Sequence, residues 1–366
     1  MVTVSNESMP LMNPGSASCR QDSRPPGFPT KLPQSDSYGL TRGCSPVPEI
    51  HSTDETTETP LPGSRENHSP DAKDLHSDPD MPDPAIIHHP DDLREFHGGT
   101  FVPTMGALHE GHLSLIQTAS QHPGPVLASI FVNPTQFSPD EDFDAYPRGL
   151  DQDASLAAEA GCDAIYAPSP ETIYPEGPEA AVAAAAAFPL PPAAIRPGLE
   201  DADRPHFFGG VCLIVQRLLQ HARPARAIFG EKDWQQLQVI DAMVAADSEL
   251  SDIAIIPAAT MRDSDGLAKS SRNTRIPPSE RDRALGLGRA LQVAHAAQHP
   301  ATAESMMRDT LDAHDLDIGY AVIRNPRTLL PVTDFTEPAR ALIAAVLRWD
   351  GGSVRLIDNR AMTVWR

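Results

Sequence analysis

Between residues 100 and 256 the sequence alternates short apolar segments with amphipathic ones, and this alternation limits the fold more than any other feature. The run Val126–Val132 is almost continuously apolar and rich in β-branched residues, which is typical of a strand buried on both faces. Strands that alternate with helices form a parallel sheet through right-handed crossovers, so the pattern predicts a Rossmann-like α/β domain. The predicted strands are 100–103, 126–132, 162–167, 225–229 and 253–256, and the predicted helices are 112–119, 151–160, 211–221 and 233–246.

After about residue 257 the sequence changes character. It becomes more charged and more helical, with short apolar strands at 322–323 and 354–357. We therefore predict a Rossmann-like domain over 85–257 and a smaller α+β C-terminal lid domain over 258–366.

The first 84 residues differ from the rest in composition. They hold 14 of the 38 prolines and 12 serines, with 6 basic and 13 acidic residues, and they show no apolar periodicity. Such a segment buries too little apolar surface to offset the entropy of ordering. We therefore expect 1–84 to be a disordered Pro/Ser-rich acidic extension without a catalytic role. Met1–Pro10 lacks the basic and apolar regions of a secretory signal, and the acidity is unlike a transit peptide, so a cytoplasmic location is expected.

Charge and cysteine content narrow the class of protein. A formal net charge of −21 argues against nucleic acid or an anionic membrane surface as a partner, because both attract surfaces rich in Lys and Arg. No apolar run reaches the ~18 residues that a membrane-spanning helix needs. The four cysteines form no CxxC pair, which favours a reducing compartment.

The loops that follow the predicted strands should carry the chemistry, because ligands of parallel α/β sheets bind beyond the carboxyl ends of the strands. The first of these loops lies in Pro103–His112 (PTMGALHEGH). Its glycines let the backbone approach a ligand, and a helix beginning near His112 would direct free N–H groups at a phosphate. Histidines can also stabilise charge on a phosphoryl group. The HExxH zinc motif is absent, because its histidines are four residues apart and these are three apart; surface histidines without function are the other alternative.

Three further loops place unusual polar residues at the same edge of the sheet. Gln136 follows a strand in NPTQF and offers an amide to a hydroxyl-bearing small molecule, although a turn-capping role is equally consistent. Lys232 in FGEKD is a point charge suited to phosphate, with Gln236 one helical turn later; an ordinary helix start capped by Asp233 is the alternative. The loop at 261–273 (MRDSDGLAKSSRN) holds two serines between a lysine and an arginine, which forms either a polyphosphate grip or a basic loop of no consequence.

These four motifs, in this order, resemble those of the pantoate–β-alanine ligase (pantothenate synthetase) family of the HxGH nucleotidyltransferase superfamily. The motifs are PTMGALHEGH, SIFVNPTQF, FGEKDWQQL and MRDSDGLAKSSRN, with weaker support from YPR, APS, IYP and RLIDN. The resemblance extends over about residues 85–366. It implies ATP-dependent condensation of pantoate with β-alanine through a pantoyl-adenylate, with release of pyrophosphate and AMP. Mg²⁺ and a homodimer are also expected from it.

The resemblance implies roles for individual residues. His112 would be the proton donor, His109 would help to stabilise the transferring phosphate, and Lys232 would complete the catalytic set. Gln136 and Gln236 would bind pantoate, with Gln136 beside the β-alanine site. No metal ligand is assigned. The positions that match the family's ATP-binding residues are Met105, Gly106, Ala107, Leu108, His109, Glu110, Gly111, His112, Gly230, Glu231, Lys232, Asp233, Met261, Lys269, Ser270, Ser271 and Arg272.

Four segments depart from the family pattern. The family's RPGHF reads RPHFF at Arg204–Phe208, Ala259 stands where proline is usual, and 274–276 lacks an aromatic residue. Ala180–Ala187, nearly all alanine, replaces a stretch that normally alternates as a strand does; we interpret it as a flexible or marginally helical surface insert. These changes fall on the flap over the active site and on the domain hinge. The four motifs are intact, so activity is expected.

Two other functions compete with the ligase. A nucleotidyltransferase of the same superfamily that transfers a nucleotide without ligation would not need the pair Gln136 and Gln236. A non-catalytic nucleotide-binding or scaffold protein would be favoured by loss of His112, Lys232 or Ser271, and all three are present. AMP release that depends on β-alanine distinguishes the ligase from the nucleotidyltransferase. Pyrophosphate formation from ATP and pantoate distinguishes the ligase from the non-catalytic protein.

Overall fold

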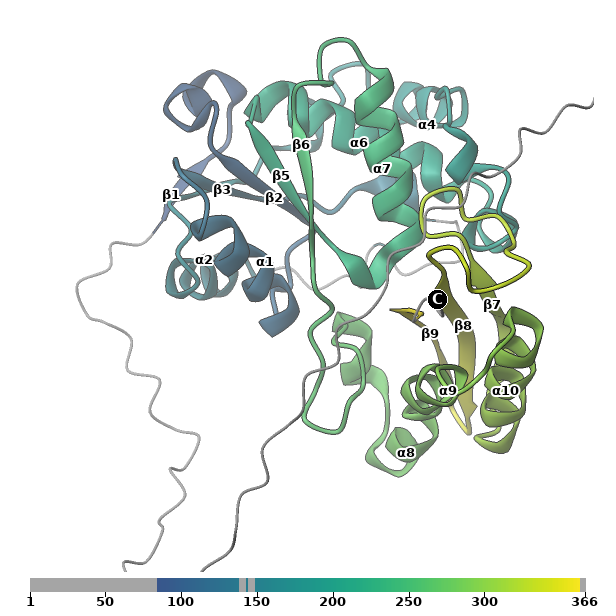
Figure 1. Ribbon diagram of the computed structural model, residues 1–366. Coiled ribbons are helices and arrows are strands. Elements are labelled where there is room, and N and C mark those ends of the chain that lie inside the picture. Colours follow the sequence, from purple (N-terminus) through teal and green to yellow (C-terminus); the bar gives the residue numbers. More distant parts are fainter. Residues whose placement is uncertain (1–83, 138–142, 144–148, 363–366) are drawn as a thin grey trace, which may run out of the picture. The chain divides into compact units, whose positions relative to one another are not determined.

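The computed structural model describes residues 84–137, 143 and 149–362, which all belong to one compact unit. The expected extension therefore lies outside the described residues, apart from Pro84. Figure 1 shows a larger sheet with its helices in the upper part and a smaller sheet with its helices below. The strands of the larger sheet are β1 (Ala85–Ile87), β2 (Thr100–Thr104), β3 (Val126–Ile130), β4 (Ala164–Tyr166), β5 (Arg226–Gly230) and β6 (Ala254–Ala258).

The larger sheet is parallel throughout, as the alternation predicted. Its strand order is β1-β4-β3-β2-β5-β6, so the chain moves outward from β2 first to one side and later to the other. The strand order reverses at β2, and ligands of such sheets bind at a reversal of this kind. The loop that carries the two histidines follows β2 directly.

Helices cover both faces of this sheet, because the strands are apolar on both sides. Phe101 and Leu127 belong to the core beneath α6 and α7, whereas their neighbours Val102 and Ala128 belong to the core beneath α1 and α2. Of the described helices, none combines the length and apolarity that crossing a bilayer requires. The four helices named here are α1 (Glu110–Ser120), α2 (Leu150–Glu159), α6 (Phe207–Ala222) and α7 (Trp234–Ala246).

Every strand and helix predicted from the alternation is present. The prediction missed β1, a strand of three residues at the sheet edge, which precedes the alternating region at 100–256. The remaining short elements of this part are η1 (Pro90–Phe96), η2 (Pro134–Gln136), α3 (Pro170–Ile173), η3 (Pro192–Ala194), α5 (Glu200–Asp203) and η4 (Glu231–Asp233).

The smaller sheet is antiparallel with the order β7-β8-β9, and α9 and α10 pack on it. This arrangement confirms the predicted α+β character of the C-terminal part. Apolar residues of both helices and all three strands share one core. The elements are β7 (Asp317–Arg324), β8 (Arg340–Trp349), β9 (Gly352–Ala361), η5 (Ser271–Arg275), η6 (Pro278–Glu280), α8 (Arg281–Ala284), α9 (Gly286–Ala294) and α10 (Pro300–Ala313).

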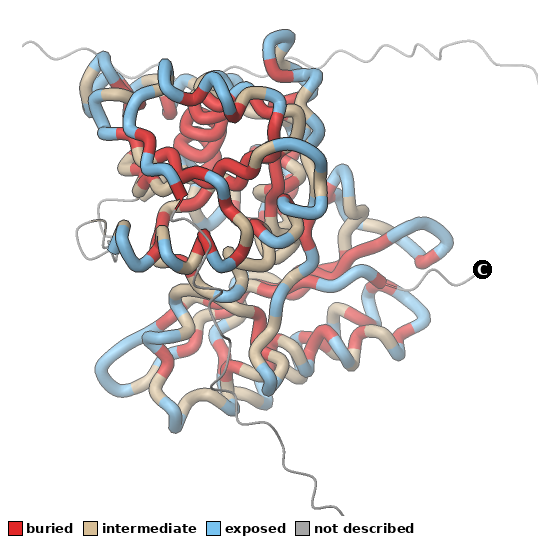
Figure 2. Tube along the Cα trace, turned by 90° about the vertical axis from the view of Figure 1, so that its left-hand side faces the viewer, coloured by how far each residue is buried: buried red, intermediate tan, exposed pale blue. Residues whose placement is uncertain are grey.

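The alanine tract forms a helix, α4 (Pro178–Ala186), with two of its alanines buried. Alanine has the highest helix propensity, and a proline suits the first turn. Ala181 and Ala185 are buried against α6, which is itself buried along most of its length; buried residues are red in Figure 2. The close approach depends on Gly209, since a Cβ there would lie 2.2 Å from the Ala185 carbonyl oxygen.

We predict that Gly210→Ala destabilises the fold, because the added Cβ would lie 2.3 Å from the Thr135 carbonyl oxygen. Overpacking of this kind costs about 1–3 kcal/mol, and each kcal/mol lowers the Tm by about 2–4 °C in a chain of this size. Gly288→Ala in α9 is the matched control, because its nearest neighbour would be 3.7 Å away. Thermal melts of both variants test this, and a Gly210→Ala protein as stable as the control would contradict the packing described.

Candidate functional site

A cleft of about 400 Å³ opens at the carboxyl ends of the strands of the larger sheet and is bordered by β8 and β9 of the smaller one. All four predicted motifs contribute to its lining. Five predicted residues lie outside the lining: Gly106, Ala107, Leu108, Glu110 and Glu231. The predicted residues that line it are Met105, His109, Gly111, His112, Gln136, Gly230, Lys232, Asp233, Gln236, Met261, Lys269, Ser270, Ser271 and Arg272.

The two histidines lie side by side at the start of α1, with ring centroids 4.1 Å apart. The helix begins at Glu110 rather than near His112, because His109 is its N-cap: Nδ1 of His109 accepts a hydrogen bond of 3.1 Å from the Gly111 N–H. An imidazole that accepts through Nδ1 carries its proton on Nε2 when it is neutral, which makes Nε2 of His109 a donor.

The prediction of free N–H groups at this turn is therefore wrong for Gly111, whose amide is already bonded. The amides of the preceding loop are also engaged. Thr104 Oγ1 accepts from the Gly106 N–H, and the Asp153 carboxylate accepts from the N–H groups of Ala107 and Leu108. The side chains of the two histidines line the cleft and can donate hydrogen bonds to a ligand there.

His112 is held neutral by its surroundings. Burial, aided by the neighbouring His109 and Lys232, lowers the pKa of His112 to about 3, and its Nδ1 has no hydrogen-bond partner among the described residues. Burial and the charges of Lys232 and Lys269 also lower the pKa of His109. Both rings are thus neutral donors in the unliganded protein, and a polyanion beside them would raise both pKa values.

Gln136 and Gln236 both border the cleft, as predicted, and their settings differ. The Asn133 side chain donates to Gln136 Oε1 at 3.1 Å, and Gln136 Nε2 donates to the Met105 sulfur at 2.9 Å. Gln136 is therefore oriented by its own loop. The Gln236 amide, on the first turn of α7, makes no hydrogen bond with another described residue. It is available to a ligand.

The turn that carries Lys232 is held by β9. Asn359 Nδ2 donates to the carbonyl oxygens of Glu231 and Lys232 at 2.8 and 2.9 Å. Arg340 of β8 bonds to Asn359 Oδ1 and to Glu231, and its guanidinium lies 3.3 Å from the Trp234 ring centroid. Asp233 occupies the N-cap position of α7 but makes no capping bond with its side chain. The fragment RLIDN supported the family resemblance, but the sequence assigned no role to its residues. The contact of Asn359 with this turn was therefore not predicted.

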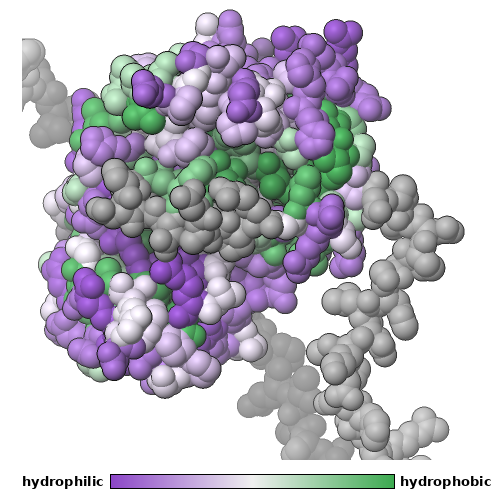
Figure 3. Space-filling model, turned by 180° about the vertical axis from the view of Figure 1, so that it is seen from behind, coloured by the Kyte–Doolittle hydropathy of each residue, from purple (hydrophilic) through white to green (hydrophobic). Residues whose placement is uncertain are grey.

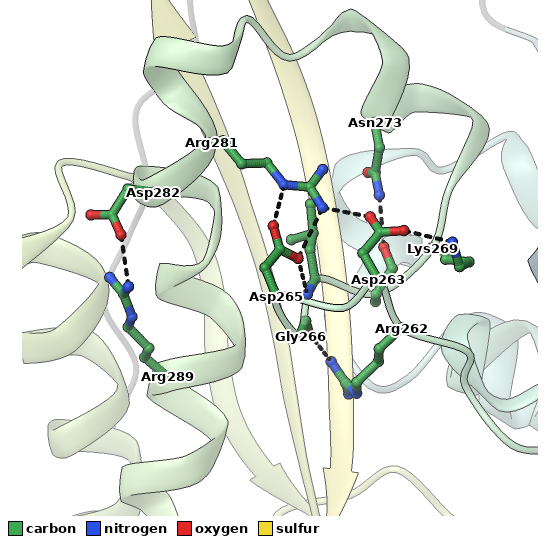
Figure 4. A network of polar contacts seen from close by, with 11 residues as sticks. Arg262, Asp263, Asp265, Gly266, Lys269, Asn273, Arg281, Asp282 and Arg289 are labelled. Carbon is green, nitrogen blue, oxygen red and sulfur yellow. Dashed lines mark hydrogen bonds and ion pairs between the residues drawn. The ribbon is translucent and has the colours of Figure 1, made fainter. Parts of the chain in front are cut away.

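The loop at 261–273 is organised by an alternating chain of charges, drawn in Figure 4. Lys269 pairs with Asp263 at 2.7 Å, and Arg281 pairs with Asp263 and Asp265 at 2.5 and 2.7 Å. Lys269 also pairs with Glu110 of α1. These partners raise the pKa of Lys269, with Asp263 as the largest cause. The lysine therefore stays charged at the cleft.

A second contact of this loop reaches β9. Arg262 donates to both carboxylate oxygens of Asp358, at 2.7 and 2.9 Å. Asn273, behind the two serines, donates to the Ala268 carbonyl oxygen. The loop is thus fixed to the smaller sheet on one side, while Ser270, Ser271 and Arg272 line the cleft on the other.

The segment that departs from the family pattern adopts an ordinary conformation. His206 is exposed with φ −91°, so the position has no need of glycine's freedom to adopt positive φ. The Arg204 guanidinium lies 4.0 Å above the Phe207 ring, and both residues line the cleft. The cleft wall continues through Glu200, which accepts hydrogen bonds from Tyr320 and Arg355 of the smaller sheet.

Comparisons with known proteins agree on one family. A family model described as pantoate-beta-alanine ligase matches residues 86–361. The chain is 42% identical over 268 residues to the pantothenate synthetase of Rhodopirellula baltica, which covers 72% of this chain and 90% of the relative. It is 44% identical over 268 residues to the pantothenate synthetase of Rubrobacter xylanophilus, and this match covers 71% of this chain and 90% of the relative.

Solved structures give the same result. The pantothenate synthetase of Thermus thermophilus superposes with a TM-score of 0.66 at 38% identity and covers 75% of this chain and 98% of that one. The pantoate-beta-alanine ligase of Francisella tularensis, solved in complex with beta-gamma ATP and beta-alanine, has a TM-score of 0.59 at 29% identity and covers 76% and 97%.

We predict that the His112 imidazole stays neutral from pH 8 down to pH 5 in the unliganded protein, because its pKa is lowered to about 3. Since an unfolded histidine titrates near pH ~6.5, the unfolded chain binds the extra proton first, and acidification below that pH destabilises the fold through this group. NMR titration of the imidazole, assigned with His112→Asn, tests this against the urea-unfolded chain. A folded-state midpoint near pH ~6.5 would contradict the burial described.

Proposed function

Because the chain belongs to the pantoate–β-alanine ligase family, it is an ATP-dependent ligase that joins pantoate to β-alanine, and we propose that the cleft described above performs both steps. In the first step a pantoate carboxylate oxygen attacks the α-phosphorus of ATP, the bond to the β-phosphate oxygen breaks, and pyrophosphate leaves. In the second step the β-alanine amine attacks the acyl carbon, the carbon–oxygen bond breaks, and AMP leaves while the amine loses a proton. The observation that carries the assignment is the convergence of all four motifs on one cleft.

The first step joins two anions, so its transition state needs positive charge and hydrogen-bond donors fixed in place. We assign the α-phosphate to His109 and His112, whose rings lie 4.1 Å apart at the N-terminus of α1. In this proposal His112 acts as a neutral hydrogen-bond donor. Its pKa of about 3 means that the imidazole is not protonated to imidazolium at neutral pH and so cannot act as an acid. A bound triphosphate raises that pKa, and the role of proton donor then follows from ligand binding.

The phosphates are assigned to the cationic side chains of the cleft. Lys232 sits on the turn after β5, and Lys269 and Arg272 come from the loop after β6, with Ser270 and Ser271 between them. In the unliganded protein Lys269 is paired with Glu110 and Asp263. We propose that the phosphates replace Glu110, whose side chain is 70% exposed and can move into solvent.

Pantoate and β-alanine are assigned to the end of the cleft at Gln136 and Gln236. Two neutral amides can read hydroxyls and a carboxylate without adding cations. The wall beside them is apolar, formed by residues such as Phe131, Phe208 and Val211, which suits the hydrocarbon part of pantoate and excludes water. An acyl-adenylate hydrolyses readily, so exclusion of water protects it.

Several accompanying features are proposals of the same kind. Mg²⁺ would neutralise charge on ATP; among the described residues no group of three or more His, Cys, Asp or Glu side chains could hold an ion, so it would enter on the phosphates and we assign it no protein ligand. The HxGH superfamily, a cytoplasmic location and the division into 85–257 and a lid over 258–366 follow from the resemblance and the composition.

A homodimer is also proposed. Val182 and Ile195 are each 58% exposed, which is high for large apolar side chains. Figure 3 shows apolar side chains in patches among hydrophilic ones on one face, chiefly around its middle and on its right-hand side. Apolar exposure of this kind supports association of two copies.

We predict that His112→Ala slows pyrophosphate formation from ATP and pantoate at least ~100-fold, because a fixed donor to the transferring phosphate is lost. His299→Ala, an exposed histidine without a side-chain capping bond, is the control and should act as wild type. In the wild type, AMP release should require β-alanine. Near-wild-type pyrophosphate release by His112→Ala would contradict its assignment, and AMP release without β-alanine would contradict the ligase reaction.

We predict that Glu110→Gln lowers the KM for ATP by about two- to tenfold, since the phosphates no longer compete with this carboxylate for Lys269. Glu179→Gln, an exposed first-turn glutamate of α4, controls for the general loss of one negative charge. Steady-state kinetics with ATP varied provide the measurement. A raised KM would instead show that Glu110 supports ATP binding.

A further inference from the structure

A buried carboxylate stands behind the loop that leads to the two histidines. Asp153 lies in the first turn of α2 and is 4% exposed. Its Oδ2 accepts from the Ala107 N–H at 2.9 Å, and its Oδ1 accepts from the Leu108 N–H at 2.7 Å. A buried carboxylate needs such partners, because burying it unpaired would be costly. No sequence pattern pointed to this contact, which joins residues 45 and 46 positions apart.

The loop that Asp153 holds is in a conformation it would not adopt readily alone. Ala107 has φ +51°, in the left-handed region that side chains other than glycine rarely occupy. Gly106 has φ +80°, and a Cβ there would lie 2.9 Å from Asp153 Oδ2, so the carboxylate fits against this backbone. The two hydrogen bonds to successive amides offset the conformational cost at Ala107.

This conformation determines where α1 begins. Leu108, held by Asp153, directly precedes His109, whose ring caps α1 through Gly111 and lies beside His112. Release of Ala107 and Leu108 would let the chain before the cap move and would shift both rings together. Asp153 does not line the cleft itself.

We propose that Asp153 is a positioning residue for the adenylation step, which fixes the phosphate-directed side chains of His109 and His112 through the Ala107 and Leu108 amides. The proposal rests on the roles proposed above for the two histidines. The alternative is that Asp153 serves α2 alone, as an acidic residue in the first turn of that helix. Asp151 occupies the same turn, is exposed, and makes no hydrogen bond to the described residues of the loop, which makes it a matched control.

The first test compares Asp153→Asn with Asp151→Asn in the full-length protein. The Ala107 and Leu108 amides donate to different oxygens of the carboxylate, and asparagine replaces one of these oxygens by an N–H₂ that faces a backbone N–H. In single turnover with ATP and pantoate, without β-alanine, we expect the rate constant of pyrophosphate formation to fall about 10- to 100-fold in Asp153→Asn, with the amplitude unchanged. We expect Asp151→Asn to match the wild type. A reduced amplitude with a normal rate constant would report misfolded protein and overturn the proposal.

The second test restores the loop by another route. Glycine adopts positive φ without a Cβ clash, so Ala107→Gly removes the conformational cost that Asp153 offsets. Added to Asp153→Asn, it should raise the rate constant of that variant about threefold or more, and the Ala107→Gly single variant gives the reference rate for this comparison. No recovery in the double variant would overturn the proposal, since a role confined to α2 is not sensitive to residue 107.

A measurement without substitutions covers the case in which Asp153→Asn does not fold. Hydrogen–deuterium exchange of the wild type should show the peptide that contains Ala107 and Leu108 protected to the level of β2, although it lies in a loop. Exchange as fast as at exposed loops would mean that the contacts do not persist, and would overturn the proposal. If Asp153→Asn keeps its rate while His112→Ala loses it, the positioning inference fails and the proposed function stands; if His112→Ala also keeps its rate, the roles of the histidines fail as well.

Discussion

The geometry of the cleft depends on one strand of the smaller sheet. Asp358 and Asn359 are consecutive on β9 and therefore point in opposite directions. Asp358 pairs with Arg262 of the loop that carries Lys269, and Asn359 donates to the carbonyl oxygens of the turn that carries Lys232. Two loops from different parts of the chain are thus held at a spacing that is set by the adjacent residues Asp358 and Asn359. Because these polar groups are buried, breaking either contact would leave an unpaired donor or acceptor.

Sequence patterns revealed the parts of this molecule that depend on local order. The alternation of apolar and amphipathic segments identified β2 to β6 of the parallel sheet and their helices, and strand ends indicated which loops would meet, because the carboxyl ends of parallel strands share one edge. Contacts between distant segments have no periodicity. Arg340 meets Glu231 across 109 residues, and Asp153 meets Leu108 across 45. A cue was available in RLIDN, where two polar residues end an apolar strand, and buried polar pairs at such places mark fixed contacts.

The phosphate recognition proposed for this cleft differs from that of a glycine-rich loop that binds anions through its amides. Here the amides of Gly106, Ala107, Leu108 and Gly111 are bonded internally, to Thr104, Asp153 and His109, while histidine and cationic side chains line the cleft. This arrangement explains how Ala107, with its positive φ, is accommodated next to Gly106. The loop has to keep a fixed shape, and a ligand does not have to approach these backbone amides closely. The arrangement also explains how a chain of net charge −21 can receive a polyanion. Charge at the site is set by a few residues, and more distant charges are screened within a Debye length of about 8–10 Å.

Two of the four departures from the family pattern, the alanine tract and Arg204–Phe208, meet at α6. α6 carries consecutive glycines, and each brings a different segment close: Gly209 admits the Ala185 carbonyl of α4, and Gly210 admits the Thr135 carbonyl of the turn that ends in Gln136. The alanine tract therefore packs on the same helix that supports a residue assigned to pantoate. A helix of small alanine residues can approach α6 closely. A segment with a different fold would need another way to pack at this distance. The neighbouring sequence can therefore change without moving Gln136 as long as Gly209 and Gly210 of α6 remain.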